Sequence, residues 1–348
     1  MFNFLKSKVF WISLLCLTLG AFSFTLLILN WEQNQIEGKL RVSIPKGVTL
    51  REVTAILSNN NMVKSEKSFM ITARLLGYEK NIQAGHLVLH EPRTNLSLVR
   101  QLVHGIPELI KVTILEGWGI KKIAEYIEDK LGISSEKIID LCKDQWFIHS
   151  LGITVPTLEG FLFPETYYFA KSESARNIIS KMVSVYQLQI SNKMRYRMEE
   201  IGFSELQMIT LASIIEGEAI YDNERKRISS VYHNRLNIGM RLQADPTIQY
   251  IIDDGPRRLL NKDLNIQSPY NTYIHKGLPP TPINNPGLQS ILAALYPDES
   301  NYIYFVARGD GYHTFTKTQA EHNSAKRDLN RLRKKLSREK RIKGKIKK

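Results

Sequence analysis

Cysteine is scarce in this sequence, which has only Cys16 and Cys142 in 348 residues. Cys16 falls in an apolar N-terminal run, so the remainder of the chain has one thiol and no possible internal disulfide. A small disulfide-stapled fold is therefore excluded. The chain is long enough to bury a core without such links.

Several common catalytic motifs are also missing. The sequence contains no Gly-x-Ser-x-Gly elbow, no His-Glu-x-x-His zinc motif, no phosphate-binding Gly-Lys-Ser/Thr loop and no Cys-x-x-Cys pair. His86 and His90 would share one face of a strand, but no cysteine or carboxylate joins them at a metal-ligand spacing. We therefore expect no metal and no cofactor, and a chemistry that depends on carboxylates.

The positive charge of the chain, +14 at pH 7, is concentrated at its C-terminal end. Residues 326–348 contain thirteen Lys or Arg and two acidic residues, so the rest of the chain is nearly balanced. A body that binds nucleic acid is therefore disfavoured. This basic tail is typical of a solvated, poorly ordered extension, and a surface for anionic polymers or lipid headgroups is the alternative.

Residues 9–31 form a run without any charged side chain, made mainly of Leu, Phe, Ile, Val and Trp. At about 1.5 Å per residue, a helix of this length crosses a hydrocarbon core of about 30 Å. Because Lys6 and Lys8 precede the run and Glu32 follows it, the N-terminus is expected in the cytoplasm. A cleaved signal peptide is the alternative, but apolar residues continue past the candidate cleavage region near Ala21. We predict a single-pass protein of the cell (inner) membrane with an extracytoplasmic, periplasmic body.

Two stretches seventy residues apart resemble each other, residues 41–53 and 111–123. Each has alternating apolar residues, then a Gly, then apolar residues at helical spacing, which predicts a strand, a turn and a helix. Chance similarity of two ordinary units is the alternative. Between them, 68–76 is predicted to be a helix and 85–90 a strand.

The predicted fold class is therefore α+β. After residue 157 the chain becomes rich in Gly, Pro, Tyr and Asn, as expected of a ligand-binding domain with long loops. The expected segments are a cytoplasmic N-terminus at 1–8, a transmembrane helix at 9–31, a linker at 32–40, a small α+β subdomain at 41–108, a mixed α+β main domain at 109–325 and the basic tail at 326–348.

One predicted helix ends in two carboxylates. Ser204 and Gln207 have the spacing of a capping box, which starts the helix. The following residues are apolar all round the axis, as in a buried helix, and they lead to Glu216 and Glu218. Burial and the negative end of the helix dipole both raise the pKa of such a carboxyl group. A raised pKa is what a general acid requires.

The two carboxylates should not act as one pair. At 100° per residue, Glu216 and Glu218 point about 200° apart, so they cannot easily flank one glycosidic bond. Periodicity does not choose between them. An ion pair with Arg225 or Arg227 is the structural alternative for either.

A set of short motifs along the chain resembles those of the MltG-type endolytic murein transglycosylases, the YceG-like family. The motifs that carry the resemblance are Gln83-Ala-Gly85, Leu158-Glu-Gly-Phe-Leu-Phe-Pro-Glu-Thr-Tyr167, Ala212-Ser-Ile-Ile-Glu-Gly-Glu218, Asn234-Arg-Leu, Leu242-Gln-Ala-Asp-Pro-Thr247, Ser268-Pro-Tyr-Asn-Thr-Tyr273, Gly277-Leu-Pro-Pro280, Asn285-Pro-Gly287, Ala293-Ala-Leu-Tyr-Pro297, Tyr304-Phe-Val306 and His313-Thr-Phe315. They follow the family's order over most of residues 41–325. Two departures are Gly217, where Lys is common, and Glu165, where Asp is common.

The resemblance implies a membrane helix, a LysM-like subdomain at 41–108, a catalytic domain at 109–325 and one essential Glu. That Glu corresponds to the first carboxylate of Glu-x-Glu, which is Glu216. Amides, hydroxyls and Tyr rings in loops shaped by proline suit sugar recognition, although loop architecture explains them equally well. The candidate substrate-binding residues are Glu218, Asn234, Gln243, Asp245, Tyr270, Asn271 and Tyr273.

The implied reaction cuts the MurNAc–GlcNAc β-1,4 bond of peptidoglycan. Glu216 would protonate the leaving oxygen and then accept the proton of the MurNAc C6 hydroxyl, which attacks C1 and leaves a 1,6-anhydro end. Termination of glycan elongation, and glycan polymerases or penicillin-binding proteins as partners, are implied by the resemblance alone. The alternatives are a non-catalytic wall-binding scaffold and a muramidase that uses water.

Overall fold

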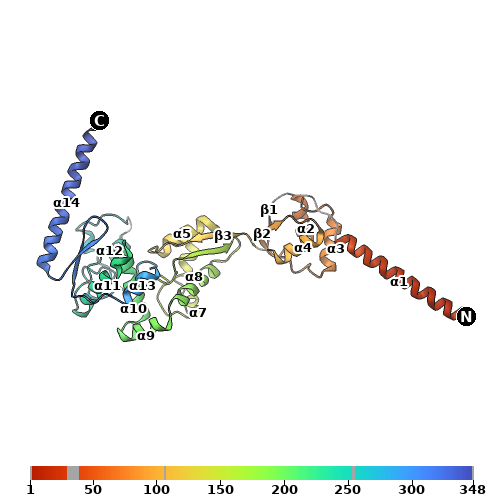
Figure 1. Cartoon of the computed structure of the whole chain (residues 1–348), viewed down its shortest axis with the longest axis horizontal. Coiled ribbons are helices and arrows are strands. Elements are labelled where there is room, and N and C mark those ends of the chain that lie inside the picture. Colours follow the sequence, from red (N-terminus) through yellow and green to blue (C-terminus); the bar gives the residue numbers. More distant parts are fainter. Residues whose placement is uncertain (1, 30–38, 106, 253–254, 347–348) are drawn as a thin grey trace. The chain divides into compact units, whose positions relative to one another are not determined.

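The computed structural model describes residues 2–29, 39–105, 107–252 and 255–346 (Figure 1). They divide into two compact units. The first comprises Met1–Lys111 with Tyr168–Glu173, and the second Val112–Tyr167 with Ser174–Lys348. Together they form a mixed α+β protein, as predicted.

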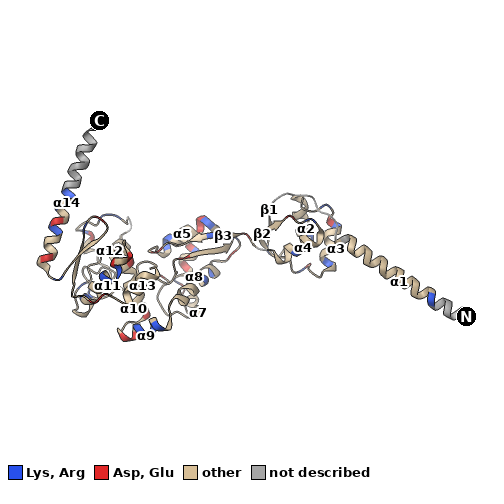
Figure 2. Ribbon diagram, in the orientation of Figure 1, with Lys and Arg blue, Asp and Glu red and all other residues tan. Residues whose placement is uncertain are grey.

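Helix α1 (Phe2–Leu29) is long and apolar enough to cross a membrane between Lys8 and Leu27. Among its described side chains only Lys8 is charged (Figure 2). The hydroxyls of Thr18 and Thr25 donate to carbonyls of the preceding turn, so neither adds an unsatisfied polar group. The last residues of the predicted transmembrane run and most of the predicted linker at 32–40 lie outside the described residues.

The first unit, beyond α1, pairs strands β1 (Lys39–Ile44) and β2 (Gly85–His90) in an antiparallel sheet. Its helices are α2 (Leu50–Asn59), α3 (Glu66–Leu75) and α4 (Asn95–His104). Alternate residues of β1, Val42 and Ile44, are buried against the helices. The predicted strand, turn and helix are confirmed here. The LysM-like nature of this subdomain stays a prediction.

Strand β3 (Leu109–Thr113) pairs with β4 (Thr166–Ala170), and the second unit begins within β3, at Val112. Helix α5 (Ile120–Leu131) follows β3, as the sequence predicts. The elements after α5 are α6 (Ser135–Leu141), α7 (Gln145–Ser150), α8 (Ala175–Gln189), α9 (Asn192–Glu200), α10 (Glu205–Glu218), α11 (Asp222–Asn237), α12 (Asp245–Ile251), the 3-10 turn Asp263–Asn265, α13 (Leu288–Leu295), strands β5 (Tyr304–Ala307) and β6 (His313–Thr316), and α14 (Gln319–Ile346).

Helix α10 is the central element of the second unit. It starts with the predicted capping box, in which Ser204 accepts from the backbone of Gln207 and the Gln207 side chain accepts from the backbone of Ser204. Residues 208–215 are all buried because α11, α12 and α13 pack around them. The last turn of α10 is thereby fixed on several sides.

The basic segment differs from its prediction. Residues 326–346 continue α14 and do not form an irregular extension. The physical reason is that Leu329 and Leu332 of this helix pack over Gly309, so that the helix is anchored before its most basic part. Lys and Arg also have high helix propensity.

Candidate active site

A cavity of about 1110 Å³ opens in the second unit. It is larger than the roughly 300–1,000 Å³ typical of small-ligand sites. One wall is formed by the start of α5, the end of α6 and the segment around Glu159. The other is formed by the end of α10 and the start of α12, with Ile283 and Asn284 between them.

Glu218, the last residue of α10, lines this cavity. The hydroxyl of Tyr232 on α11 donates to Glu218 Oε1 at 2.9 Å, and the backbone N–H of Asp245 also donates to this carboxylate. Burial, reinforced by the nearby Asp245 carboxylate, raises the pKa of Glu218 to about 7. A substantial fraction of Glu218 is therefore protonated near neutral pH, while two donors are in place for its charged form.

Asp245 lines the cavity beside Glu218. The hydroxyl of Tyr273 donates to Asp245 Oδ1. Burial raises the pKa of the Tyr273 phenol, so it remains a donor. This hydrogen bond from Tyr273 fixes the orientation of the Asp245 side chain.

Tyr250 contributes an aromatic ring to the same cavity. Its ring centroid lies 4.9 Å from that of Tyr270, and the Tyr270 hydroxyl lies 2.7 Å from Thr281 Oγ1. Tyr270 therefore supports the ring of Tyr250. Such a ring can stack on the apolar face of a sugar.

Glu159 is a second buried acid of the cavity wall, with 5% of the residue exposed. Its carboxylate accepts from the backbone N–H of Ile120 at 3.1 and 3.2 Å and from Asn285 Nδ2 at 3.0 Å. Burial raises the pKa of Glu159 to about 8. Glu159 lies in the motif Leu158–Tyr167, and the sequence alone predicts no role for it.

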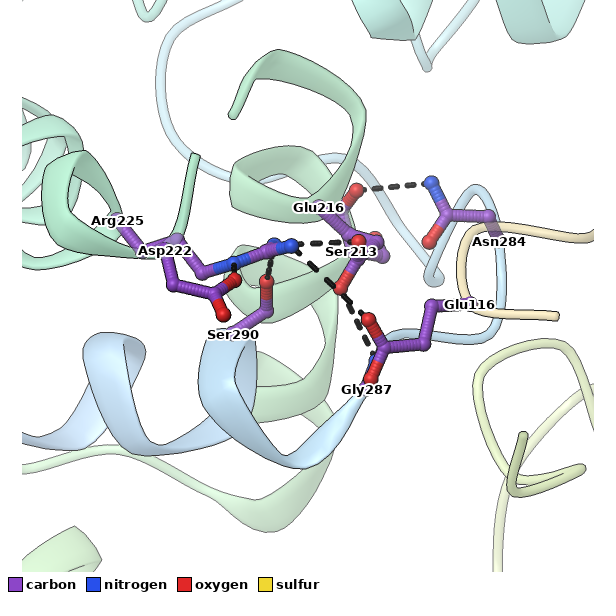
Figure 3. Close-up of polar contacts among 8 residues, drawn as sticks. All are labelled: Glu116, Ser213, Glu216, Asp222, Arg225, Asn284, Gly287 and Ser290. Carbon is purple, nitrogen blue, oxygen red and sulfur yellow. Dashed lines mark hydrogen bonds and ion pairs between the residues drawn. The ribbon is translucent and has the colours of Figure 1, made fainter. Parts of the chain in front are cut away.

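Glu216, one residue from Gly217 and two from Glu218, has entirely different surroundings (Figure 3). Its Oε1 lies 3.1 Å from Arg225 Nη1, and its Oε2 accepts from the backbone N–H of Gly287 at 3.0 Å. The side chain is 7% exposed, and Glu216 is absent from the lining of the cavity. The structural alternative weighed for this carboxylate, an ion pair with Arg225, is what the structure contains.

Arg225 contacts three other side chains besides Glu216. Its guanidinium binds Asp222 at 2.9 Å, hydrogen-bonds the hydroxyl of Ser290 and lies 4.0 Å from Glu116 (Figure 3). Glu116 in turn lies so close to Gly287 that a Cβ there would be 1.7 Å from its Oε1. A side chain at 287 would therefore have to displace the Glu116 carboxylate.

Three other predicted binding residues, Asn234, Gln243 and Asn271, do not line the cavity. Asn271 is fully buried and donates to the carbonyls of Leu264 and Ile266, and Asn234 donates to the carbonyls of Ser300 and Tyr302. Gln243 is exposed and has a positive φ of 48°. The side-chain amides of Asn234 and Asn271 organise loops, and a sugar-binding role for the three residues stays a prediction.

Asn284 was not predicted by sequence reasoning. It is 7% exposed, lines the cavity and donates through Nδ2 to the Ser213 carbonyl at 2.9 Å. Its Oδ1 has no hydrogen-bond partner within the described parts of the chain. A buried acceptor of this kind is expected to be satisfied by a ligand or by water.

Among the described residues, no group of three or more His, Cys, Asp and Glu is arranged to hold a metal ion.

The chain is similar to known proteins over most of its length. The sequence model of the YceG-like family matches residues 42–328. The endolytic murein transglycosylase of Bacillus subtilis (strain 168) is 34% identical over 323 residues, 88% of this chain and 89% of the relative. That of Streptococcus pneumoniae (strain D39) is 28% identical over 315 residues, which cover 81% of this chain and 57% of the longer relative. A 2.6 Å crystal structure of a YceG-like protein of Listeria monocytogenes superposes with a TM-score of 0.58 at 33% identity, covering 83% of this chain and 99% of that one.

Proposed function

This chain belongs to the YceG-like family, and on that premise we propose that it is a membrane-anchored, endolytic lytic transglycosylase acting on peptidoglycan. Its reaction is the cleavage of MurNAc–GlcNAc β-1,4 bonds to leave 1,6-anhydro-MurNAc ends. The substrate class is supported by the curated relatives, which are named endolytic murein transglycosylases.

We propose Glu218 as the acid/base of this reaction, in place of Glu216, to which the resemblance assigns that role. The observation that carries the choice is that Glu218 lines the cavity with a pKa raised to about 7, whereas Glu216 binds Arg225 and the backbone of Gly287. A general acid must reach the substrate and carry a proton at the start of the reaction.

The reaction needs only one carboxyl group. Protonated Glu218 donates to the glycosidic oxygen as the C1–O bond breaks. The C6 hydroxyl of the same MurNAc attacks C1, and Glu218, now a carboxylate, accepts its proton. The donors Tyr232 and Asp245 N–H stabilise Glu218 during its charged interval. Because the nucleophile belongs to the substrate, proximity supplies part of the rate.

The membrane anchor defines where such an enzyme would act. We propose that α1 crosses the cell membrane with its N-terminus in the cytoplasm and the two units outside. An enzyme anchored in this membrane meets nascent glycan strands beside their membrane-bound polymerases. This location supports a role in terminating glycan elongation and an association with penicillin-binding proteins. A reporter fused after Lys348 that is active only in the cytoplasm would contradict this topology.

The test of the reaction compares two isosteric variants of the full chain in detergent. Glu218→Gln should release anhydro-ended fragments from purified peptidoglycan about 10²–10⁴-fold more slowly than the wild type, the usual value of a general acid. Glu216→Gln should retain most of the activity wherever its thermal transition shows a folded protein. Mass spectrometry identifies the products. Activity lost in folded Glu216→Gln and kept in Glu218→Gln would reverse the assignment.

A muramidase that uses water is the second candidate. The observation that favours it is a second carboxylate, Asp245, on the same cavity as Glu218, because hydrolases employ two carboxyl groups. The same mass spectra decide between the candidates, since water gives reducing ends and the C6 hydroxyl gives anhydro ends. Binding of glycan strands without any product would favour a scaffold.

A further inference from the structure

Three lysines line the cavity that contains Glu218: Lys121 and Lys122 on the first turn of α5, and Lys143 after α6. All three are exposed. Within the described ranges no carboxylate forms an ion pair with any of them, and Glu125 is the one exposed acid on the same wall. This wall therefore has an excess of positive charge that the protein leaves uncompensated.

The position of two of these lysines works against the helix that holds them. The first turn of α5 contains no acidic residue, and a cation near the positive end of a helix dipole destabilises the helix. Lys122 is held in place, because its Nζ lies 4.6 Å from the centre of the Trp118 ring. Residues that destabilise their own helix, as these lysines do, are expected mainly at functional sites.

The two walls of the cavity therefore differ in charge. Glu218 and Asp245 lie on the wall formed by α10 and α12, and the three lysines lie on the wall formed by α5 and α6. A ligand that matches both walls has a neutral part for the acids and an anionic part for the lysines.

Peptidoglycan has this division of charge, because its sugars are neutral and its stem peptides carry carboxylates. We propose that Lys121, Lys122 and Lys143 form a subsite for the carboxylates of the stem peptide on the MurNAc next to the cleaved bond, so that the enzyme selects peptide-bearing strands. The proposal rests on the proposed function and adds a preference within it. A phosphate polymer attached at C6 of MurNAc is a poorer match, since the reaction requires a free C6 hydroxyl.

The experiment uses the full chain in detergent and two substrates, uncross-linked strands with their stem peptides and the same strands with the peptide carboxylates converted to amides. For the wild type, kcat/KM should be about tenfold or more higher on the strands with free peptide carboxylates, the size of effect expected for charge-assisted contacts. In the triple variant Lys121→Gln, Lys122→Gln, Lys143→Gln this ratio should fall towards one. The control variant Lys137→Gln, Lys181→Gln, Lys193→Gln alters three exposed lysines outside the cavity lining and should keep the wild-type ratio.

A binding measurement separates this subsite from the reaction. Titration of Glu218→Gln with MurNAc-pentapeptide and with the same compound whose peptide carboxylates are amidated should give a Kd about tenfold lower for the former, and the three lysine substitutions should remove that difference. Equal rates on both substrates with equal Kd values, or an unchanged preference in the triple variant, would overturn the subsite. Inorganic phosphate that competes as well as the pentapeptide would overturn the carboxylate assignment. Wild type that binds with the preference but forms no anhydro products would refute the proposed function alone.

Discussion

Glu216 and Glu218 are separated by one glycine on the last turn of α10, yet Glu216 pairs with Arg225 at 3.1 Å while Glu218 accepts from the Tyr232 hydroxyl at 2.9 Å. The separation follows from helix geometry, which points the two side chains about 200° apart. Glu216 ties the helix end to α11 and to the segment before α13. The anchored turn then holds Glu218 at the cavity.

The neighbours of Glu218 predict opposite shifts in the pH dependence of the reaction. The rate should fall as pH rises through the pKa of Glu218, about 7, because the acid then loses its proton. Tyr232→Phe removes a donor to the charged form, so the fall should move to higher pH. Asp245→Asn removes a negative neighbour, so the fall should move to lower pH. Profiles of kcat/KM against pH measure both midpoints, and a shift of both variants in the same direction would contradict the account.

Arg225 should be the residue of this region that matters most for stability. Its side chain is 7% exposed and neutralises Glu216, which is equally buried. Arg225→Met leaves that carboxylate without a counter-charge and should lower the free energy of unfolding by about 3–5 kcal/mol. Arg331→Met is the control, because its pair with Asp328 is exposed at 81% and 67% and should contribute less than about 1 kcal/mol. Urea unfolding followed by the fluorescence of Trp118 and Trp146 measures both, and equal losses would contradict this role.

Glu159 predicts a pH-dependent difference in stability. Its pKa is raised from an ordinary value of 4.5 to about 8 in the folded state. Between these values the folded protein holds a proton that the unfolded chain has lost, so this group makes the protein less stable as pH rises. Glu159→Gln removes the titration, and relative to the wild type the variant should gain up to about 1.4 kcal/mol per pH unit between pH 5 and 8. The exposed substitution Glu199→Gln provides the control, and a difference that does not change with pH would rule out the buried titration.

Local patterns were sufficient to predict the elements around the site. The capping box of Ser204 and Gln207, the buried character of α10 and the divergence of its two acids follow from residues that are close in sequence. The choice between Glu216 and Glu218 does not, since it depends on Gly287 and on the N–H of Asp245, which lie on other elements. Periodicity contains no information on such distant partners.

The loop residues illustrate the same limit. Asn271 and Asn234 are of a residue type that often binds sugars, but their side-chain amides donate hydrogen bonds to backbone carbonyls of neighbouring loops. Glu159 has its partners Ile120 and Asn285 at 39 and 126 residues of separation. Its burial therefore had no local signal beyond its place in a family motif.

Gly217 offers a test of how tightly the two sides of the site are coupled. A Cβ at this position would lie 2.6 Å from Pro246 Cβ and 2.8 Å from Pro246 Cγ, so Gly217→Ala must displace the first turn of α12. Alanine is otherwise favoured over glycine in a helix by about 1 kcal/mol, so any loss has to come from this contact. Because Asp245 precedes Pro246 and its N–H binds Glu218, the displacement should lower kcat by about 10–100-fold. Pro246→Gly added to Gly217→Ala removes the clash and should recover part of the activity, which a double-mutant cycle in kcat measures. Strictly additive effects of the two substitutions would mean that α12 moves independently of the acid.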